Sequence, residues 1–290
     1  MPELPEVETT VRDLSEKIIG RKIVDVFCDS PNLIKKPSSF ASFKKEITGK
    51  KILDIQRRGK YILFFLSHNK VLIAHQKLTG HFLYGKWKKE KGQWIPLFEG
   101  ALNDPMNKFI HLVFVLDNGW MLALSDLRKF ARIELIDKEE LKNHKELNSL
   151  GPDALDPKLT PKKFVGIVAS KKRPIKQVLM DQTLIAGIGN IYSDEALFDA
   201  GIHPLRKANE LSNEELKKLF NSIKKVLKRG LETGGESISD YRHIDGTKGN
   251  FDKYRKVYRR EGEKCKRCGA LIQRKKLGQR STYFCPNCQK

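Results

Sequence analysis

Apolar positions near the N-terminus repeat at helical spacing. Val7, Val11, Leu14 and Ile18 fall on one face of a helix, and Gly20 follows as a stop signal. From residue 22 onward the pattern changes to short β-branched and aromatic runs, which predict strands. These runs are KIVDVF, KILDIQ, YILFFL, KVLIAH, HLVFVL, MLALSD and ARIELI. With a second, shorter helix expected near 38–48, residues 1–136 predict a mostly antiparallel sheet system with flanking helices.

Two connections in this region carry their own signals. Asp117-Asn118-Gly119 separates two of the runs, and an Asn-Gly pair in that position predicts a hairpin. Residues 86–108 show no clean periodicity, so we expect a long loop or a decorated hairpin there.

The pattern becomes helical after Ile136. We expect a charged helix at 138–148, and Gly-Pro and Asp-Pro pairs mark a linker at 151–157. Further helices are predicted near 161–170, 174–182, 190–200 and 212–231. Ser212 and Glu215 form a capping box at the start of the last one. A polar, glycine-containing loop follows at 233–249.

Four cysteines lie in the last 26 residues. Cys265-x2-Cys268 and Cys285-x2-Cys288 are separated by sixteen residues, a spacing typical of a four-cysteine zinc site. Two such pairs can surround one tetrahedral Zn²⁺ and leave no position open for water, so the ion would be structural. Two disulfides or a redox pair are the alternatives. We expect one Zn²⁺ per chain, within a β-hairpin.

The charge balance points to a polyanionic partner. The 290 residues include 56 Lys and Arg against 35 Asp and Glu, a formal net charge of +21. The last fifty residues contain 15 basic and four acidic side chains, with aromatic residues between them. Such a surplus favours nucleic acid, because each neutralised phosphate releases a condensed counterion. A solvated basic tail, or high lysine usage in the organism, is the alternative.

The composition also indicates the cellular compartment of the protein. No apolar run reaches the ~18 residues that a membrane span requires. The acidic start MPELPEVETT has no apolar core of a signal peptide, and the cysteines are not spread as a disulfide framework. We therefore expect a cytoplasmic protein without a membrane partner.

Several motifs follow one another along the whole chain. They are MPELPEVE (1–8), RRGKY (57–61), SDLRKF (125–130), LMDQTLIAGIGNIYSDEALFDAGIHP (179–204) and GQRSTYFCPNCQK (278–290). Together they resemble the bacterial formamidopyrimidine-DNA glycosylases. The resemblance implies an α+β multidomain fold: an N-terminal β-sandwich (1–136), a linker region (137–157), a helix–two-turn–helix domain (158–250) and a C-terminal zinc finger (251–290).

The resemblance also implies a catalytic set. Once Met1 is removed, Pro2 offers a secondary amine whose usual pKa of about 7.7–8.0 leaves a neutral fraction near pH 7. Glu3 would protonate the sugar ring oxygen, Glu6 would position the amine, and Lys60 would contact phosphates that flank the lesion. Helix-terminal acids favoured by the macrodipole, and a solvated lysine at a strand end, are the ordinary alternatives.

Further residues are implied to bind DNA. Leu78, Arg128 and Phe130 would fill the gap left by an extruded base, Asn190 and Tyr192 would meet phosphates, and His111 would also contact DNA. Arg280, which belongs to the implied catalytic set, would bridge the phosphates that flank the lesion. Asn190 could instead cap its helix, and His111 could be an ordinary sheet residue. The motif at 75–80 reads HQKLTG where relatives have HLxMxG, which leaves the base contacts of Thr79 open. Residues 236–249 match in position the loop that recognises the damaged base in that family.

The resemblance thus implies a bifunctional DNA repair enzyme. It would excise oxidised purines from duplex DNA and cleave abasic strands through a Schiff base, as a monomer associated with the bacterial nucleoid. Two rivals are a DNA-lesion binder without chemistry and an enzyme of this architecture that prefers oxidised pyrimidines.

Overall fold

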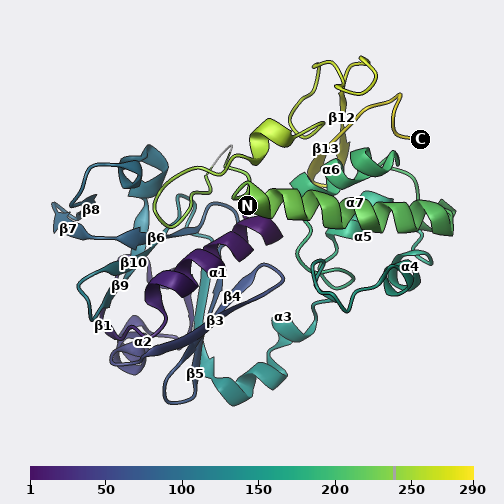
Figure 1. Cartoon of the computed structure of the whole chain (residues 1–290). Helices are drawn as coiled ribbons and strands as arrows, with labels where there is room; N and C mark the ends of the chain where they lie inside the picture. The colour runs from purple at the N-terminus through teal and green to yellow at the C-terminus, as the bar shows by residue number, and fades with distance from the viewer. Residues whose placement is uncertain (238–239) are drawn as a thin grey trace. The chain divides into compact units, whose positions relative to one another are not determined.

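The structure is a computed structural model that describes residues 1–237 and 240–290. The described residues form two compact units (Figure 1). The N-terminal unit comprises residues 1–148 and 233–252, and the C-terminal unit comprises 149–232 and 253–290. The 233–252 segment thus folds with the first unit although it follows the helices of the second. The domain boundaries at 136, 157 and 250 stay a prediction.

The N-terminal unit is a β-sandwich. One sheet has the strand order β1-β9-β10-β6, and the other has the order β2-β11-β5-β4-β3. All neighbours are antiparallel except β2 and β11. The strands are β1 (Ile23–Cys28), β2 (Ile34–Lys36), β3 (Ile52–Arg58), β4 (Tyr61–Leu66), β5 (Lys70–His75), β6 (His81–Gly85), β9 (Ile110–Leu116), β10 (Met121–Ser125) and β11 (Arg132–Asp137).

Helices α1 (Leu4–Ile18) and α2 (Phe40–Ile47) contribute to the core of the sandwich. Val7 and Leu14 of α1 are fully buried, and they belong to the same cluster as Phe43, Phe64 and Phe114 from α2 and both sheets. The apolar stripe that predicted α1 is therefore the face that holds the start of the chain against the sandwich.

The 86–108 segment is a decorated hairpin, one of the two expected forms. Strands β7 (Trp87–Glu90) and β8 (Gln93–Pro96) pair antiparallel, and the short 3-10 helices η2 (Ala101–Asn103) and η3 (Pro105–Lys108) follow. The hairpin predicted at Asp117–Gly119 also forms, because β9 and β10 pair across it and Gly119 has a φ of 75°.

The predicted charged helix at 138–148 is wrong as one element. Residues Lys138–Asn143 form a 3-10 helix, η4, and Lys145–Asn148 form the single turn α3. The stretch has too few apolar residues for a helical stripe, since Leu141 and Leu147 lie six positions apart.

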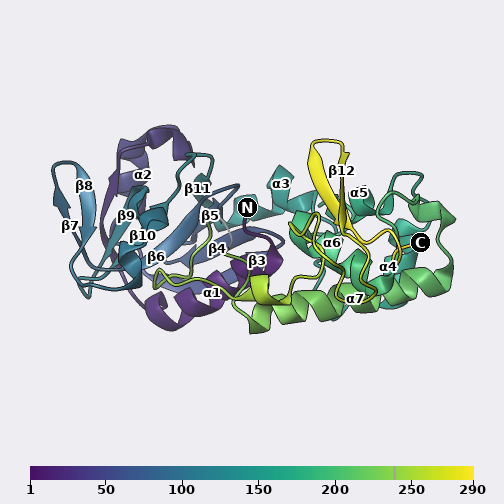
Figure 2. The same cartoon turned by 90° about the horizontal axis from the view of Figure 1, so that it is seen from above.

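The C-terminal unit contains four main helices and a hairpin. They are α4 (Pro161–Val168), α5 (Ile175–Met180), α6 (Asn190–Ala200), α7 (Asn213–Glu232), β12 (Gln273–Leu277) and β13 (Arg280–Phe284). The capping box is confirmed, since the backbone nitrogen of Ser212 donates to Glu215 Oε2 and that of Glu215 donates to Ser212 Oγ. The hairpin lies beside α6 (Figure 2). The predicted α+β class is confirmed.

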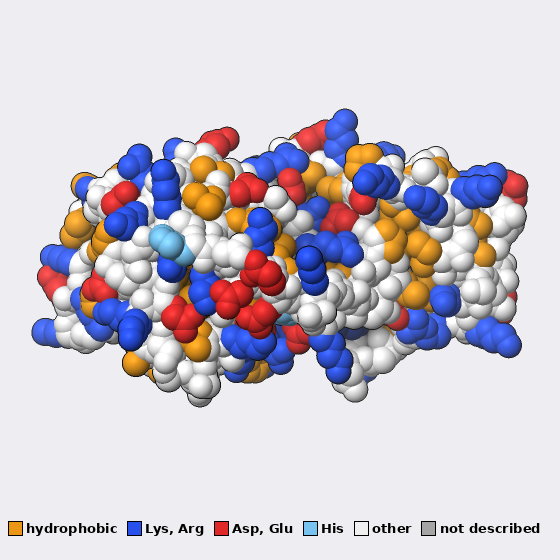
Figure 3. Space-filling view, turned by 90° about the horizontal axis from the view of Figure 1, so that it is seen from below, with side chains coloured by type: hydrophobic (Ala, Val, Ile, Leu, Met, Phe, Trp, Pro, Cys, Tyr) orange, Lys and Arg blue, Asp and Glu red, His pale blue; other side chains and the backbone are white. Residues whose placement is uncertain are grey.

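The charge on the face drawn in Figure 3 is mixed. Lys and Arg side chains are spread over it, and a group of Asp and Glu side chains lies near its centre. This face therefore does not offer one continuous basic surface to a polyanion. Among the described residues, no helix has both the length and the apolar character that crossing a membrane requires.

Candidate active site and zinc site

The N-terminal unit holds the residues of the predicted catalytic set. Pro2 is buried, and Glu3 and Glu6 are only 2% and 1% exposed at the first turn of α1. Glu3 is the N-cap of the helix. The macrodipole stabilises acidic side chains at a helix N-terminus, and it does so for exposed side chains as well. The burial of both carboxyl groups goes beyond what this ordinary explanation requires.

Glu6 connects the start of the chain to the 233–252 segment. Its Oε2 atom accepts a hydrogen bond from the backbone nitrogen of Glu3 (2.7 Å), and its Oε1 atom accepts one from the backbone nitrogen of Glu236 (2.8 Å). Gly235 packs so closely that a Cβ there would lie 2.7 Å from Glu6 Oε1. The hydroxyl of Tyr241 donates to the carbonyl oxygen of Glu6 (3.2 Å).

Lys60 lies in the tight turn between β3 and β4 and is 6% exposed. Arg57 fixes this turn, since its Nη1 donates to the carbonyl oxygen of Gly59 (2.9 Å) and its Nε donates to Glu8 Oε2 on α1 (2.8 Å). A solvated lysine at a strand end, the ordinary alternative, does not describe a side chain this buried.

The terminal amine is in an unusual environment. In the full chain it belongs to Met1, and burial lowers the pKa of this amine below its usual 8.0. The carboxylates of Glu3 and Glu6 oppose the shift, and the charge of Lys60 adds to it. A neutral amine beside two carboxyl groups and a cation can act as a nucleophile near neutral pH.

Two turns carry the residues predicted to fill the gap in the DNA. Leu78 is half-buried, whereas Arg128 and Phe130 are exposed, and the Arg128 guanidinium lies 4.6 Å from the centre of the Phe130 ring. Buried Asp126 joins the turns, because it accepts from the hydroxyl of Thr79 and from the backbone nitrogen of Ala131 (2.8 Å).

Thr79 therefore has a structural contact that its sequence motif did not indicate. Its hydroxyl donates to Asp126 and also accepts from the backbone nitrogen of Arg128 (3.0 Å), and the residue is 6% exposed. His111, on β9, is paired through Nδ1 with Asp29 Oδ1 (2.8 Å). That contact favours the sheet-residue interpretation of His111.

The remaining predicted contacts lie in the C-terminal unit. Asn190 is the first residue of α6 and Gly189 is the N-cap, so the capping role for Asn190 is wrong. The Oδ1 atom of Asn190 is buried without a hydrogen-bond partner among the described residues. Tyr192 is 1% exposed, and this burial favours a packing role over direct contact with DNA.

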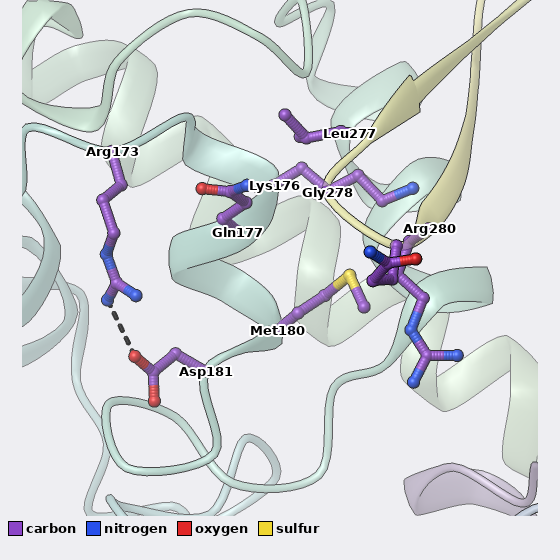
Figure 4. Close-up of a pocket in the computed structure, with 9 residues that line it drawn as sticks. Arg173, Lys176, Gln177, Met180, Asp181, Leu277, Gly278 and Arg280 are labelled. Carbon is purple, nitrogen blue, oxygen red and sulfur yellow. Dashed lines mark hydrogen bonds and ion pairs between the residues drawn. The ribbon is translucent and has the colours of Figure 1, made fainter.

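Arg280 begins β13 and is exposed at the rim of a pocket of about 420 Å³ (Figure 4). The pocket lies between α5 and the hairpin, and Gln177, Met180 and Gly278 line it. Arg173 and Asp181 form an ion pair of 2.7 Å at its other side. The cationic side chain of Arg280 is thus available for an anionic ligand.

A buried ion pair that sequence reasoning missed holds the hairpin. Lys176 of α5 and Asp194 of α6 are 2.7 Å apart and at most 1% exposed. Lys176 Nζ also donates to the carbonyl oxygen of Ser281, and Asp194 Oδ2 accepts from the backbone nitrogen of Tyr283, each at 3.0 Å. No local pattern in the sequence indicates this pair, because it is fixed by tertiary packing.

The four cysteines gather as the spacing predicted. Their sulfur atoms lie within 4.8 Å of one another. Cys265 and Cys288 are 3.9 Å apart, and Cys268 and Cys285 are 3.5 Å apart. A tetrahedral zinc ion with Zn–S distances of about 2.3 Å requires sulfur separations of about 3.8 Å, whereas a disulfide requires about 2.05 Å. The donor set therefore fits one Zn²⁺, and the disulfide alternative is wrong.

Comparisons with known proteins agree with this arrangement along the chain. Residues 1–133 match the family model of the formamidopyrimidine-DNA glycosylase N-terminal domain, and residues 150–242 match the H2TH domain of the same glycosylase. The chain belongs to the formamidopyrimidine-DNA glycosylase family. Residues 262–290 match the zinc finger found in FPG and IleRS, so the predicted zinc module is confirmed.

Relatives of this glycosylase match over its whole length. The formamidopyrimidine-DNA glycosylase of Pelotomaculum thermopropionicum is 40% identical, with 100% of this chain and 99% of the relative covered. A variant of the Lactococcus lactis FPG, solved with DNA that contains Fapy-dG, is 35% identical with a TM-score of 0.86 and full coverage of both chains. The Lactococcus lactis Fpg bound to DNA with an abasic site is 35% identical, with a TM-score of 0.86 and 99% of each chain covered.

Proposed function

We propose that this glycosylase removes oxidised purines, such as 8-oxoguanine and formamidopyrimidines, from duplex DNA and then cleaves the abasic strand. The names of its relatives and their complexes with Fapy-dG and abasic DNA support this substrate class. The acidic pair and the cation around the buried start of the chain support a catalytic function over simple binding of lesions.

In this proposal Pro2 is the nucleophile once Met1 has been removed. Its neutral amine forms a bond to C1′ of the deoxyribose while the bond from C1′ to the base breaks, and the proton that the amine loses goes to the leaving base. Glu3 protonates the ring oxygen as the sugar opens to an iminium ion. A secondary amine gives an iminium that keeps its positive charge, which acidifies the C2′ proton. Loss of protons then expels the 3′ phosphate and the 5′ phosphate in turn, and water releases the amine.

The other predicted residues receive supporting roles. Glu6 holds the backbone at the amine, and Lys60, Asn190 and Arg280 bind phosphates around the extruded nucleotide. Leu78, Arg128 and Phe130 fill the gap that the extruded base leaves, which offsets part of the unstacking cost. We keep DNA contact as a proposal for His111 and Tyr192, although their contacts in the structure favour other roles.

Zinc has a structural role in this proposal. Cys265, Cys268, Cys285 and Cys288 would hold one ion, which supplies a rigid cross-link for the hairpin that carries Arg280 and takes no part in the chemistry. We further propose that the protein acts as a monomer in the bacterial cytoplasm, at the nucleoid, because its substrate is genomic DNA.

The single observation that carries the proposal is the burial of Glu3 and Glu6 beside a terminal amine of lowered pKa. Borohydride should trap the purified enzyme covalently on 8-oxoguanine duplex, and both Pro2→Gly and retention of Met1 should abolish the adduct. A panel of duplexes with oxidised purines and oxidised pyrimidines ranks the substrates. An adduct that persists in Pro2→Gly would contradict the proposed nucleophile, and excision of pyrimidines alone would favour the rival specificity.

A further inference from the structure

The 233–252 segment leaves the C-terminal unit, folds against the sandwich and returns. Its two ends meet, because the backbone nitrogen of Asn250 donates to the carbonyl oxygen of Thr233 (2.8 Å) and that of Phe251 donates to Gly235 (3.1 Å). The first part of the segment touches Glu6 through Glu236, as described above. A base attached to a sugar at the N-terminal amine would therefore lie next to this segment. Ile238 and Ser239, within the predicted lesion-recognition loop, lie outside the described residues.

The far part of the segment contacts the 86–108 segment, for which the sequence indicated no role. Arg242 is 4% exposed, and its Nη2 donates to Asp104 Oδ1 (3.1 Å). Lys248 Nζ lies 3.8 Å from Asp104 Oδ2. Burial opposes ionisation of Asp104, but hydrogen bonds from the Met106 backbone and from Arg242 outweigh it and lower the pKa of this carboxyl. Asp104 is therefore an ionised partner for a guanidinium that is almost completely buried.

A second contact joins the two segments at Gly246. Asn107 is 1% exposed, and its Nδ2 donates to the carbonyl oxygens of Ala101 (2.9 Å) and Gly246 (3.3 Å). His81 Nε2 lies 3.0 Å from Asn107 Oδ1 and fixes the amide from the other side. Gly246 has a φ of +88°, and a Cβ there would lie 2.6 Å from the backbone of Ala101. The two backbones thus approach as closely as glycine permits.

We propose that the 86–108 segment holds the 233–252 segment in the conformation that accepts a damaged base, with Asp104 and Asn107 as positioning residues for base selection. The proposal rests on the proposed glycosylase function. It follows from the two attachments of one segment. Glu6 ties the segment to the backbone of Glu3, next to the predicted nucleophile, and Asp104 and Asn107 tie it to the 86–108 segment. Removing Asp104 would leave the Arg242 charge buried without this carboxylate, and the segment would have to move to solvate it.

The test uses one variant on each side of the contact, in the full-length zinc-loaded enzyme. Asp104→Ala removes the carboxylate, and Gly246→Ala forces the backbones apart. Glu90→Ala is the matched control for the first, since Glu90 pairs with Lys88 on the same hairpin at an exposed position. Gly92→Ala is the control for the second, because Gly92 has a φ of +82° and nothing within 4 Å of a Cβ.

Two measurements separate positioning from general damage. Hydrogen exchange of the backbone amides of His243 and Gly246, which are bonded within the segment, should accelerate in both variants and in neither control. Single-turnover excision of 8-oxoguanine should fall about 10- to 100-fold, while cleavage of a duplex with a preformed abasic site should stay within about twofold. The abasic substrate has no base to select, so a positioning role predicts this split.

Unchanged exchange in Asp104→Ala and Gly246→Ala would overturn the proposal, and so would an equal loss of excision and abasic-site cleavage. If Asp104→Ala does not fold, Gly246→Ala and Asp104→Asn give the same comparison. A wild-type enzyme that releases no oxidised purine would contradict the proposed function instead, and the exchange comparison would still decide whether the hairpin holds the segment.

Discussion

The Oε2 atom of Glu6 lies 2.7 Å from the backbone nitrogen of Glu3, one residue away from the predicted nucleophile. Because the other oxygen of the same carboxylate accepts from the backbone nitrogen of Glu236, a single buried side chain on α1 fixes its own helix start to a backbone stretch that lies 230 positions further along the chain. Both contacts need an acceptor. A carboxylate meets that requirement and an amide does not, since one of its two terminal atoms carries hydrogens.

Replacement of Glu6 by Gln should therefore destabilise the protein. One of the two backbone N–H groups would face the amide NH2 group, and a buried unsatisfied donor costs about 1–3 kcal/mol. Urea denaturation measures the change in the free energy of unfolding. Glu16→Gln is the control, because Glu16 lies on the same helix but is exposed. Equal stabilities of Glu6→Gln and the wild type would contradict the two contacts.

The rate of imine formation should depend on pH through the terminal amine. Burial lowers the pKa of the amine at the chain terminus, where it is Met1 before processing. The same surroundings should act on Pro2 once it becomes the terminus. Only the neutral amine is nucleophilic, so the rate should rise with pH through an amine pKa that lies below the usual value of about 8 and then level off.

Borohydride trapping on an abasic-site duplex, measured in single turnovers from about pH 5 to pH 9, checks this profile. We expect the rate to reach half of its maximum at a pH below about 8. A rate that continues to climb up to pH 9 would show that the amine retains an ordinary or raised pKa, against the effect of burial.

Zinc should be required for DNA binding by the C-terminal unit. Cys265 and Cys285 are buried in a small cluster with Phe198, Val257 and Ile272, which is too small a core to fold without a cross-link. Metal analysis should find about one Zn²⁺ per chain, and Cys285→Ser should lose both the ion and affinity for duplex DNA. Cys28→Ser is the matched control, since Cys28 lies outside the four-cysteine cluster. Full DNA affinity in zinc-free Cys285→Ser would contradict this role.

Sequence patterns predicted the parts of the fold that depend on the spacing of residues close together along the chain. The α1 stripe, the β9–β10 hairpin and the paired cysteines each depend on local spacing, and each is confirmed. Strand β6 was not predicted, because four of its five residues are buried and the run shows no alternation.

The buried polar contacts could not be predicted in the same way. Asp126, Lys176 and Asp194 are ordinary surface residue types, and each has at least one partner far along the chain, at separations of 47, 106 and 89 positions. Such pairs are fixed by tertiary packing, which leaves no local periodicity. The contacts of Asp104 and Asn107 with the 233–252 segment are of this kind as well, which is why the 86–108 segment carried no functional signal.

Gln76 provides a stability test at a buried position of the N-terminal unit. The side chain is 2% exposed, and neither amide atom has a hydrogen-bond partner among the described residues. Burying an amide without partners is unfavourable, and an apolar side chain of similar size avoids that cost. Gln76→Leu should therefore raise the free energy of unfolding by about 1–2 kcal/mol, which corresponds to about 2–4 °C in Tm for each kcal/mol in a protein of this size class.

Thermal unfolding of Gln76→Leu and of a control variant measures this change in Tm. Gln56→Leu is suitable, because Gln56 is exposed and its amide donates to Asp54 Oδ2 (2.7 Å), so the same substitution should give no gain there. Activity on an abasic-site duplex should be retained in both variants. A lower Tm for Gln76→Leu than for the wild type would mean that the amide satisfies its hydrogen-bonding groups in solution, and the buried glutamine would then be a stabilising residue.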